Sequence, residues 1–368
     1  MIIKGYYNKL EGSHYEIGKQ IGKVIRSKSE LLKQYISEEN CLENTVLEEV
    51  ISLLDQYCPN INEEIQGFCD ELKIQKGQVK YYQESYMYTG CSHGMIPYTR
   101  TKDKCTYVYR NYDFTHLADD MRLCSVHSHE KYSHIGFSIG LFGRSEGMNE
   151  EGLCITFSAC GTPVGSLSWL RKPAVTGLQF WTVVRSVLDN CKTVEEAVDL
   201  IQSMPIVSNS NFLLTEPSGK SALIQVFDGV KDIIFDNNQD ARYTLFATNH
   251  EVIKSSSRYG SPKVYNSKHR YNTLKNYMFQ HDFIDIEEFK TFFHGKYPNG
   301  LSVHYYEQFF GTLRSVIFNL TDRSLEFCYG SPCYNNKVKL RFGDDLPFSE
   351  INVNIESELS DRDFWKLI

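Results

Sequence analysis

Short runs rich in β-branched and aromatic residues fill much of the chain from Lys104 onward, and they constrain the fold more than any other feature. Turn signals at Pro217–Gly219 and Asp228–Gly229 separate three of them, so residues 211–236 are predicted to form a three-stranded meander. Two runs around Thr321–Ser324 are typical of a hairpin. The other runs include CTYVYRNYDF, HIGFSIGLFG, GLCITFSAC and RYTLFATNH.

Helical spacing of apolar residues occurs in separate blocks, chiefly in the first ninety residues. Thr193 followed by Glu196 has the pattern of a capping box at a helix start. Because helices and strands fall into blocks rather than alternating, the sequence predicts an α+β layered fold. The predicted helices lie within Glu16–Leu54, with a break near Glu39–Asn44, and at Glu63–Leu72, Gln78–Tyr88, Leu178–Asn190, Thr193–Met204, Tyr271–Phe279 and Ile286–Phe293.

Composition excludes several classes of protein. The 368 residues carry a net charge of −7 without a basic stripe, so neither nucleic-acid nor membrane-surface binding is predicted. The sequence lacks a run of about 18 apolar residues, so we expect no transmembrane helix, and its first residues lack an apolar h-region, so we expect no signal peptide. Its 11 cysteines, an odd number without CxxC pairs, favour reduced thiols, and we therefore expect a cytoplasmic protein.

Cofactor and metal motifs are also missing from the sequence. It contains no dinucleotide fingerprint, Walker A, HExxH or GxSxG motif, so we predict no cofactor. His127, His129 and His134 lie close together in the sequence, but partners at zinc-finger spacing are lacking. Alternation along a solvated strand explains these histidines, and we predict no metal site.

The junction YMYTGCSHGM places Gly90 directly before Cys91, where the helical block gives way to strands. There the thiol could attack the preceding carbonyl in an N-to-S acyl shift, since Gly tolerates strained backbone geometry. Hydrolysis would free Cys91 with its own α-amino group, whose ordinary pKa of about 7.7–8.0 suits a general base. Nucleophile and base would then share one residue. Alone, a Gly–Cys pair is more often a turn into a core strand.

The segment RNYDF, about twenty residues after Cys91, ends a predicted strand and contains two charged residues, Arg110 and Asp113. If this strand pairs antiparallel with one beginning at Cys91, Asp113 returns close to Cys91 and can orient its amino group. Arg110 would favour the thiolate. The alternative is a surface Arg–Asp pair of little energetic value.

Four further polar residues are candidates for the same site. Asn249 in ATNH ends a strand and could donate to an oxyanion, or simply support a turn, and Asn211 has the same two readings. Arg270 and Arg314 could each hold a substrate carboxylate or supply positive potential near the thiolate, or lie on the surface.

Taken in order, these segments resemble the acyl-CoA:6-aminopenicillanic acid acyltransferase family, which is related to the choloylglycine hydrolases among the N-terminal nucleophile hydrolases. The resemblance covers about residues 10 to 335. It rests on the Gly–Cys junction, RNYDF, GRSEGMNEEGLCITF, NFLLTEPSG, ATNH, SKHRY and LRSVIFNLTDRSLEFCYGSPC, with EGSHYEIGKQIG and IQGFCDELKI near the start.

The resemblance implies a four-layer αββα fold and a precursor cut between Gly90 and Cys91. It would yield a helical segment of residues 1–90 and a catalytic domain of residues 91–368. By position, Cys91 matches the nucleophile, Asp113 the acid near the new amino terminus, and Asn249 the oxyanion-site residue. Arg110 matches an arginine of the bile-salt-hydrolase branch, and Arg314 a functional arginine of the acyltransferase branch.

Two departures from the family pattern stand out. The related hydrolases carry a second Asn where this sequence has Ser158 and Ala159, and His93 stands where small or β-branched residues are common.

We therefore predict an amidohydrolase or acyltransferase that acts on carbon–nitrogen bonds other than ordinary peptides. Its substrate would be an acyl-amide or acyl-thioester, and the cut chains would stay associated. Two alternatives remain: an uncut, inactive αββα binding protein, and an uncut thiol hydrolase with His93 or His250 as base. Whether the processed unit pairs into a homo-oligomer stays open.

Overall fold

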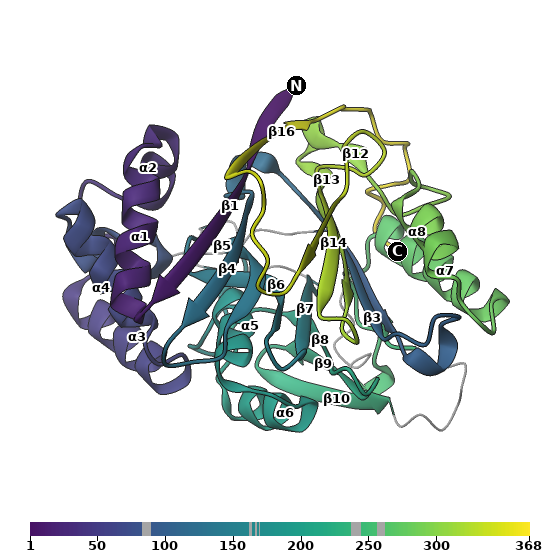
Figure 1. Cartoon of the computed structure of the whole chain (residues 1–368), viewed down its shortest axis with the longest axis horizontal. Coiled ribbons are helices and arrows are strands. Elements are labelled where there is room, and N and C mark those ends of the chain that lie inside the picture. The colour runs from purple at the N-terminus through teal and green to yellow at the C-terminus, as the bar shows by residue number, and fades with distance from the viewer. Residues whose placement is uncertain (83–89, 162–163, 166–167, 169, 237–243, 256–261) are drawn as a thin grey trace.

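Two mixed-length β-sheets form the centre of the computed structural model, which describes residues 1–82, 90–161, 164–165, 168, 170–236, 244–255 and 262–368 (Figure 1). The larger sheet has the order β10-β9-β8-β7-β6-β5-β4-β1-β16. Its strands are β1 (Ile2–Gly12), β4 (Arg122–Ser128), β5 (His134–Ile139), β6 (Gly143–Asn149), β7 (Cys154–Ala159), β8 (Ser210–Thr215), β9 (Ser221–Phe227), β10 (Val230–Asp236) and β16 (Glu350–Asn354).

The second sheet has the order β11-β2-β3-β13-β14-β15, with β12 paired to β13. Its strands are β2 (Gly90–Ile96), β3 (Tyr107–Phe114), β11 (Phe246–Ala247), β12 (His304–Tyr305), β13 (Phe310–Asn319), β14 (Ser324–Tyr329) and β15 (Val338–Arg341). The predicted meander is confirmed as β8, β9 and β10, and the predicted hairpin as β13 and β14.

Helices cover the outer faces of the two sheets. On the larger sheet, Phe180 of α5 (Phe180–Asn190) stacks on Phe157 of β7 with ring centroids 3.6 Å apart. On the second sheet, Phe289 of α8 (Ile286–His294) packs on Tyr109 of β3 at 4.7 Å. The sheets face each other where His93 of β2 contacts β7. The predicted α+β sandwich is confirmed, with layers in the order αββα.

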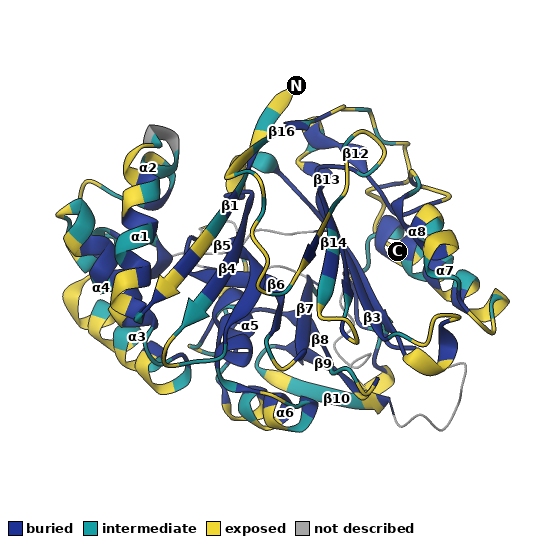
Figure 2. Cartoon of the chain, viewed as in Figure 1, coloured by how far each residue is buried: buried dark blue, intermediate teal, exposed yellow. Residues whose placement is uncertain are grey.

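Burial follows from this layering. Every residue of β2, β3, β6, β8 and β9 is buried, since helices or the opposite sheet cover both faces (Figure 2). The remaining helices are α1 (His14–Arg26), α2 (Ser29–Tyr35), α3 (Asn44–Tyr57), α4 (Ile61–Leu72), α6 (Val194–Ser203) and α7 (Tyr265–Gln280). Thr193 caps α6 by accepting from the Glu196 N–H, as the sequence indicates.

The N-terminal segment is not purely helical, because it begins with β1. This strand lies between β4, to which it runs parallel, and β16, to which it runs antiparallel. Strand β1 belongs to the same sheet as strands that follow Cys91. A cut at residue 90 would therefore divide the chain into two polypeptides without separating two structural domains, and this cut stays a proposal.

Three helix predictions differ from the structure. The predicted run Glu16–Leu54 is interrupted at residues 27–28, between α1 and α2, as well as before α3. The described part of Gln78–Tyr88 holds short 3₁₀ turns at Lys76–Gln78 and Lys80–Tyr82, and residues 83–88 lie outside the described residues. Helix α7 begins at Tyr265, before the predicted start at Tyr271. The sequence pattern does not reveal this first turn, because the turn buries polar groups and lacks an apolar stripe.

Two absences concern the described residues. None of their helices is long and apolar enough to cross a membrane. Nor do they contain a cluster of three metal-ligating side chains.

Candidate active site

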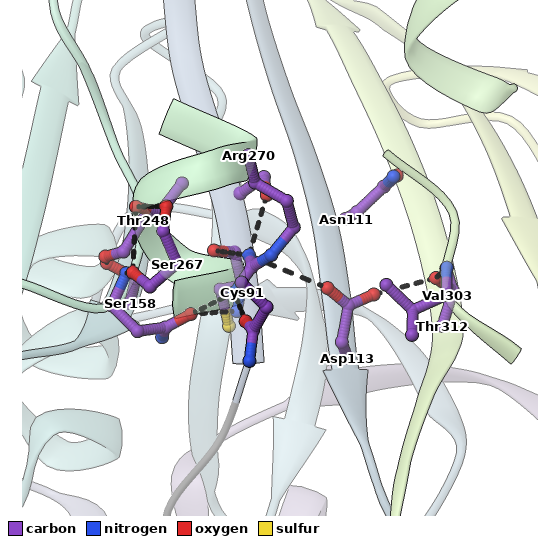
Figure 3. Close-up of polar contacts among 12 residues, drawn as sticks. Cys91, Asn111, Asp113, Ser158, Thr248, Ser267, Arg270, Val303 and Thr312 are labelled. Carbon is purple, nitrogen blue, oxygen red and sulfur yellow. Dashed lines mark hydrogen bonds and ion pairs between the residues drawn. The ribbon is translucent and has the colours of Figure 1, made fainter. Parts of the chain in front are cut away.

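Cys91 is the second residue of β2, and strand pairing decides what surrounds it. In the antiparallel register with β3, Gly90 lies opposite Asp113 and Cys91 opposite Tyr112. Strand β13 pairs with the other edge of β3, and α7 lies over the β2 end (Figure 3). Residues from β2, β3, β13, α7 and the end of β11 therefore meet at one buried place.

Cys91 is fully buried, and polar partners hold both its nitrogen and its sulfur. Its backbone N–H donates to Asn249 Oδ1 at 2.8 Å. Its Sγ accepts from Arg110 Nη2 at 3.2 Å. A buried positive charge therefore lies in direct contact with the sulfur.

Arg110 is held against the sulfur by a buried carboxylate. Its Nη1 donates to Ser145 O at 2.6 Å and pairs with Glu146. The same Glu146 accepts from Arg314 Nε at 2.7 Å, and Arg314 also pairs with Asp119 at 3.0 Å. Two arginines and two carboxylates thus share one buried network, and Arg110 is the member that contacts the Cys91 sulfur.

Arg270 reaches the site from α7 and contacts the backbone of Cys91. Its Nη1 donates to Cys91 O at 2.6 Å and to Ser92 Oγ at 2.8 Å. Its Nη2 donates to Asn249 Oδ1 at 2.9 Å and to Asn266 Oδ1 at 2.8 Å (Figure 3). The guanidinium therefore ties β2 to the residue that accepts from the Cys91 nitrogen.

Asp113 is a buried acid beside Arg270. Its Oδ1 accepts from Thr312 Oγ1 at 2.7 Å, and its Oδ2 lies 3.9 Å from Arg270 Nη1. Burial raises the pKa of Asp113 to about 6, against the lowering effects of Arg270, the Thr312 hydrogen bond and Arg110. A carboxyl with this pKa can exchange a proton near neutral pH.

Asn249 is fixed on both sides of its amide. Its Nδ2 donates to Ala159 O at 3.1 Å, and its backbone N–H donates to Ser267 Oγ at 2.8 Å. The same hydroxyl lies 2.8 Å from His250 Nδ1. His250 is therefore engaged behind Asn249, and burial lowers its pKa to about 3.

His93 points with Cys91 but contacts the opposite sheet instead of the sulfur. Its ring nitrogens lie 2.7 Å from Thr156 Oγ1 and 3.1 Å from Ser158 Oγ. Burial, with Arg110 nearby, lowers the pKa of His93 well below its usual value, so the ring is neutral.

Gly90 occupies a position that a side chain cannot enter. A β-carbon there would run into the Phe310 ring. The residue before Cys91 is thus held between β3 and the aromatic ring of Phe310, and glycine is required for this close approach.

Residues 100–334 match the family described as acyl-coenzyme A:6-aminopenicillanic acid acyl-transferase. The chain belongs to this family. The matched region holds Arg110, Asp113, Asn249 and Arg270, whereas Gly90 and Cys91 precede it. Among curated proteins, no sequence matches the chain.

Solved structures of several acylases and amidases are similar to the chain. Penicillin V acylase from Agrobacterium tumefaciens has 18% sequence identity over 68% of this chain and 86% of that chain, with a TM-score of 0.46. A mutant of conjugated bile acid hydrolase from Clostridium perfringens has 14% identity over 74% and 99%, with a TM-score of 0.45. The N-acylethanolamine-hydrolyzing acid amidase ortholog from Caenorhabditis elegans has 13% identity over 62% and 93%, with a TM-score of 0.43.

In this family member, the structure brings together Cys91, Arg110, Asp113, Asn249 and Arg270. It does not bring Arg314 or Asn211 to the sulfur. Arg314 pairs with Glu146, which also pairs with Arg110, and Asn211 Nδ2 donates to Ser158 Oγ at 3.2 Å and Thr248 O at 3.1 Å. Ser158 and Ala159 thus serve as a hydroxyl and a carbonyl beneath Asn249.

Sequence reasoning missed Glu146, Thr312, Asn266 and Ser267. Glu146 lies inside GRSEGMNEEGLCITF, one of the segments that carry the family resemblance, and Thr312 lies two residues before Arg314. Asn266 and Arg270 are four residues apart, a spacing that places both on one face of a helix. This spacing could have indicated that Asn266 lies beside Arg270, but only if the helix were predicted to begin at Tyr265.

Proposed function

We propose that Cys91 is the nucleophile of an N-terminal nucleophile enzyme that cuts its own chain after Gly90. The observation that carries the proposal is the pair of contacts at Cys91: its nitrogen donates to Asn249 Oδ1 and its sulfur accepts from Arg110. Nitrogen and sulfur of one residue are each held by a separate polar partner inside a buried site. Such an arrangement suits a residue whose amine and thiol both take part in chemistry.

Self-cleavage begins with attack of Cys91 Sγ on the Gly90 carbonyl carbon. The bond from that carbon to the Cys91 nitrogen breaks, and the thiol proton ends on this nitrogen. Asp113 lies opposite Gly90 in the register, on the face of the sheet away from Sγ, and its carboxylate can orient the nitrogen that receives the proton. Water then hydrolyses the thioester, which leaves a carboxylate on Gly90 and a free amine and thiol on Cys91.

Turnover repeats the same chemistry on a substrate amide or thioester. Sulfur bonds to the acyl carbon while the Cys91 amine takes the thiol proton and passes it to the leaving group. Asn249 and a backbone N–H stabilise the oxyanion. The acyl group then leaves sulfur for water, or for an amine in a transfer reaction, and a proton returns to sulfur. We favour hydrolysis of a linear amide, because water is always present.

The ionisation of Asp113 suits a carboxylate that orients the Cys91 nitrogen. With a pKa of about 6, the carboxyl is mostly ionised at neutral pH and can pair with the positive charge that the Cys91 nitrogen takes up. Arg270 bridges Asp113, Asn249 and the Cys91 carbonyl, and so holds this carboxylate and the scissile region in one geometry.

The alternatives have less support. A histidine base would need to reach the Cys91 sulfur, but His93 contacts Thr156 and Ser158 and His250 contacts Ser267. A pure binding protein has no need for a buried arginine against a thiol beside a buried acid.

Intact mass of the purified protein tests the proposal. We expect two chains, residues 1–90 and 91–368, and a single chain for Cys91→Ala. Cys154→Ala, which removes another buried thiol, serves as the control and should cut normally. Cys91→Ser should cut slowly, because a hydroxyl is a poorer nucleophile than a thiolate.

Acylation is tested with an N-acyl amide and with an acyl-coenzyme A plus 6-aminopenicillanic acid. Cut protein should gain the mass of the acyl group on the 91–368 chain at short times. A wild-type chain that stays whole and inert would refute the proposal, and a whole chain that hydrolyses amides would point to the histidine alternative.

A further inference from the structure

Residues 361–368 run along the start of α7 and end at the point marked C in Figure 1. We call this segment the strap. It pairs antiparallel with the residues just before the helix through a bridge between Val264 and Leu367. Ile368 N–H donates to Lys263 O at 2.8 Å, and Asp361 Oδ1 accepts from Phe364 N at 2.9 Å.

The strap supplies the hydrogen-bond acceptors that the first turn of α7 needs. The N-cap of this helix is Val264, which gives no side-chain hydrogen bond. The first N–H groups of a helix have no partner within it and require an acceptor elsewhere. Here Tyr265 N–H donates to Lys366 O at 2.8 Å and Asn266 N–H to Phe364 O at 3.3 Å.

Asn266 transmits this support to the site. Its Nδ2 donates to Phe364 O at 3.0 Å, and its Oδ1 accepts from Arg270 Nη2 at 2.8 Å. One amide therefore connects a strap carbonyl with the guanidinium that contacts Cys91 O and Asn249. Asn266 itself is buried and lies one turn before Arg270 on the same helix face.

The two aromatic side chains of the strap give a second, independent link, since Trp365 also packs on Phe310, at 5.1 Å. Phe364 is fully buried and packs edge-on against Phe310 with ring centroids 5.4 Å apart. Phe310 is the ring that a β-carbon at Gly90 would strike. Tyr297 and Tyr305 close around Phe364 at 5.2 and 4.7 Å. The ring beside the scissile residue is thus backed by the strap.

We propose that the strap positions Arg270 and Phe310 for the reaction at Cys91, with Asn266 and Phe364 as positioning residues. The strap lies outside residues 100–334, the part that matches the family. The inference rests on the proposed function for its kinetic consequence, but the capping of α7 does not depend on it.

The test measures the rate of the Gly90–Cys91 cut against pH, in newly synthesised chains. A chain ending at residue 360, Phe364→Ala and Asn266→Ala should each cut at least about tenfold more slowly, because reacting groups lose their alignment. The conservative Phe364→Leu should recover most of the rate. Phe289→Ala removes a buried ring of α8 outside the site and is the control for lost stability.

The pH profile separates positioning from general weakening of the fold. The groups that bear on Asp113 are Arg270 on α7, Arg110 on β3 and Tyr306 beside β13. If Arg270 moves away, Asp113 binds its proton more tightly, so the acidic limb of the profile should shift to higher pH. Phe289→Ala should leave the limb in place, even if it lowers the amount of folded protein.

Hydrogen exchange of residues 265–270 gives a readout that needs no cleavage. Strap variants should exchange faster there than wild type, whereas Phe289→Ala should not. Wild-type cutting rates and an unmoved acidic limb in Phe364→Ala and Asn266→Ala would overturn the inference. If the wild-type chain itself stays uncut, the proposed function fails, and exchange alone decides: equal protection with and without the strap would overturn it.

Discussion

Replacing Asp113 with Asn should make the protein more stable at neutral pH while stopping its self-cleavage. Asn mimics the protonated acid and keeps an oxygen that can accept from Thr312. The comparison is made in a Cys91→Ala background, so that parent and variant are both single uncut chains. An active-site acid that costs the fold stability is expected where burial serves chemistry.

The magnitude follows from the pKa of the buried carboxyl. Burial raises it from 3.8 to about 6, and the attraction of Arg270 and Arg110 is already contained in that value. Each pKa unit corresponds to about 1.4 kcal/mol, so ionised Asp113 costs the fold about 3 kcal/mol at pH 7. The folded state keeps its proton longer than the unfolded state, so this acid's contribution is most favourable below pH 4. It is lost as pH rises from about 4 to about 6.

Urea unfolding at a series of pH values measures the effect. The Asp113→Asn variant should match its parent near pH 4 and exceed it by about 3 kcal/mol at pH 7. The control is Asp285→Asn at the partly exposed start of α8, where backbone N–H donors from Glu288 and Glu287 lower the aspartate's pKa. That variant should show no gain at pH 7. A stability difference for Asp113→Asn that stays constant with pH, or a loss at pH 7, would refute the reasoning.

Three further changes have defined outcomes. Gly90→Ala should block the cut, since the added β-carbon meets the Phe310 ring, and Phe310→Leu in the same chain should restore cutting in part. Intact mass measures both outcomes, and normal cutting of Gly90→Ala alone would contradict the close contact between Gly90 and Phe310. Glu146→Gln should cost about 3–5 kcal/mol in urea unfolding, because it breaks a buried ion-pair network. It should also slow the cut after Gly90, and an unchanged cutting rate would show that Glu146 does not hold Arg110 against the sulfur. Glu64→Gln removes the one of the two buried carboxylate partners of Arg185 that lies within residues 1–90. Residues 1–90 should then separate from 91–368 on dilution in gel filtration, where the parent stays joined, and equal retention would contradict this.

Local sequence patterns predicted those parts of the fold that local residues determine. The meander β8–β10 and the hairpin β13–β14 have turn residues between β-rich runs, and both are where the sequence indicates. Strand β1 was missed because its sequence, IIKGYYNKLEG, mixes charges and glycine with apolar residues. It becomes a strand by pairing with β4 and β16, which lie more than a hundred residues away.

The site divides in the same way. Cys91, Asp113 and Asn249 were predicted because they occupy strand ends in an ordered series of motifs, and their roles remain proposals. Glu146 was not predicted, because its importance arises between elements: its carboxylate joins Arg110 of β3 with Arg314 of β13. Buried charge pairing of this kind depends on how the two sheets face each other, which no local pattern encodes.

Strand β1 gives the proposed cut a lasting consequence. Once the bond after Gly90 is broken, a strand from one polypeptide remains hydrogen-bonded between β4 and β16 of the other. Folding of the precursor is a reaction within one molecule, whereas refolding of the cut enzyme requires two chains to meet. The apparent stability of the mature enzyme would then depend on protein concentration, as for any complex of two partners. A molecule that loses residues 1–90 at high dilution would have no intramolecular route back.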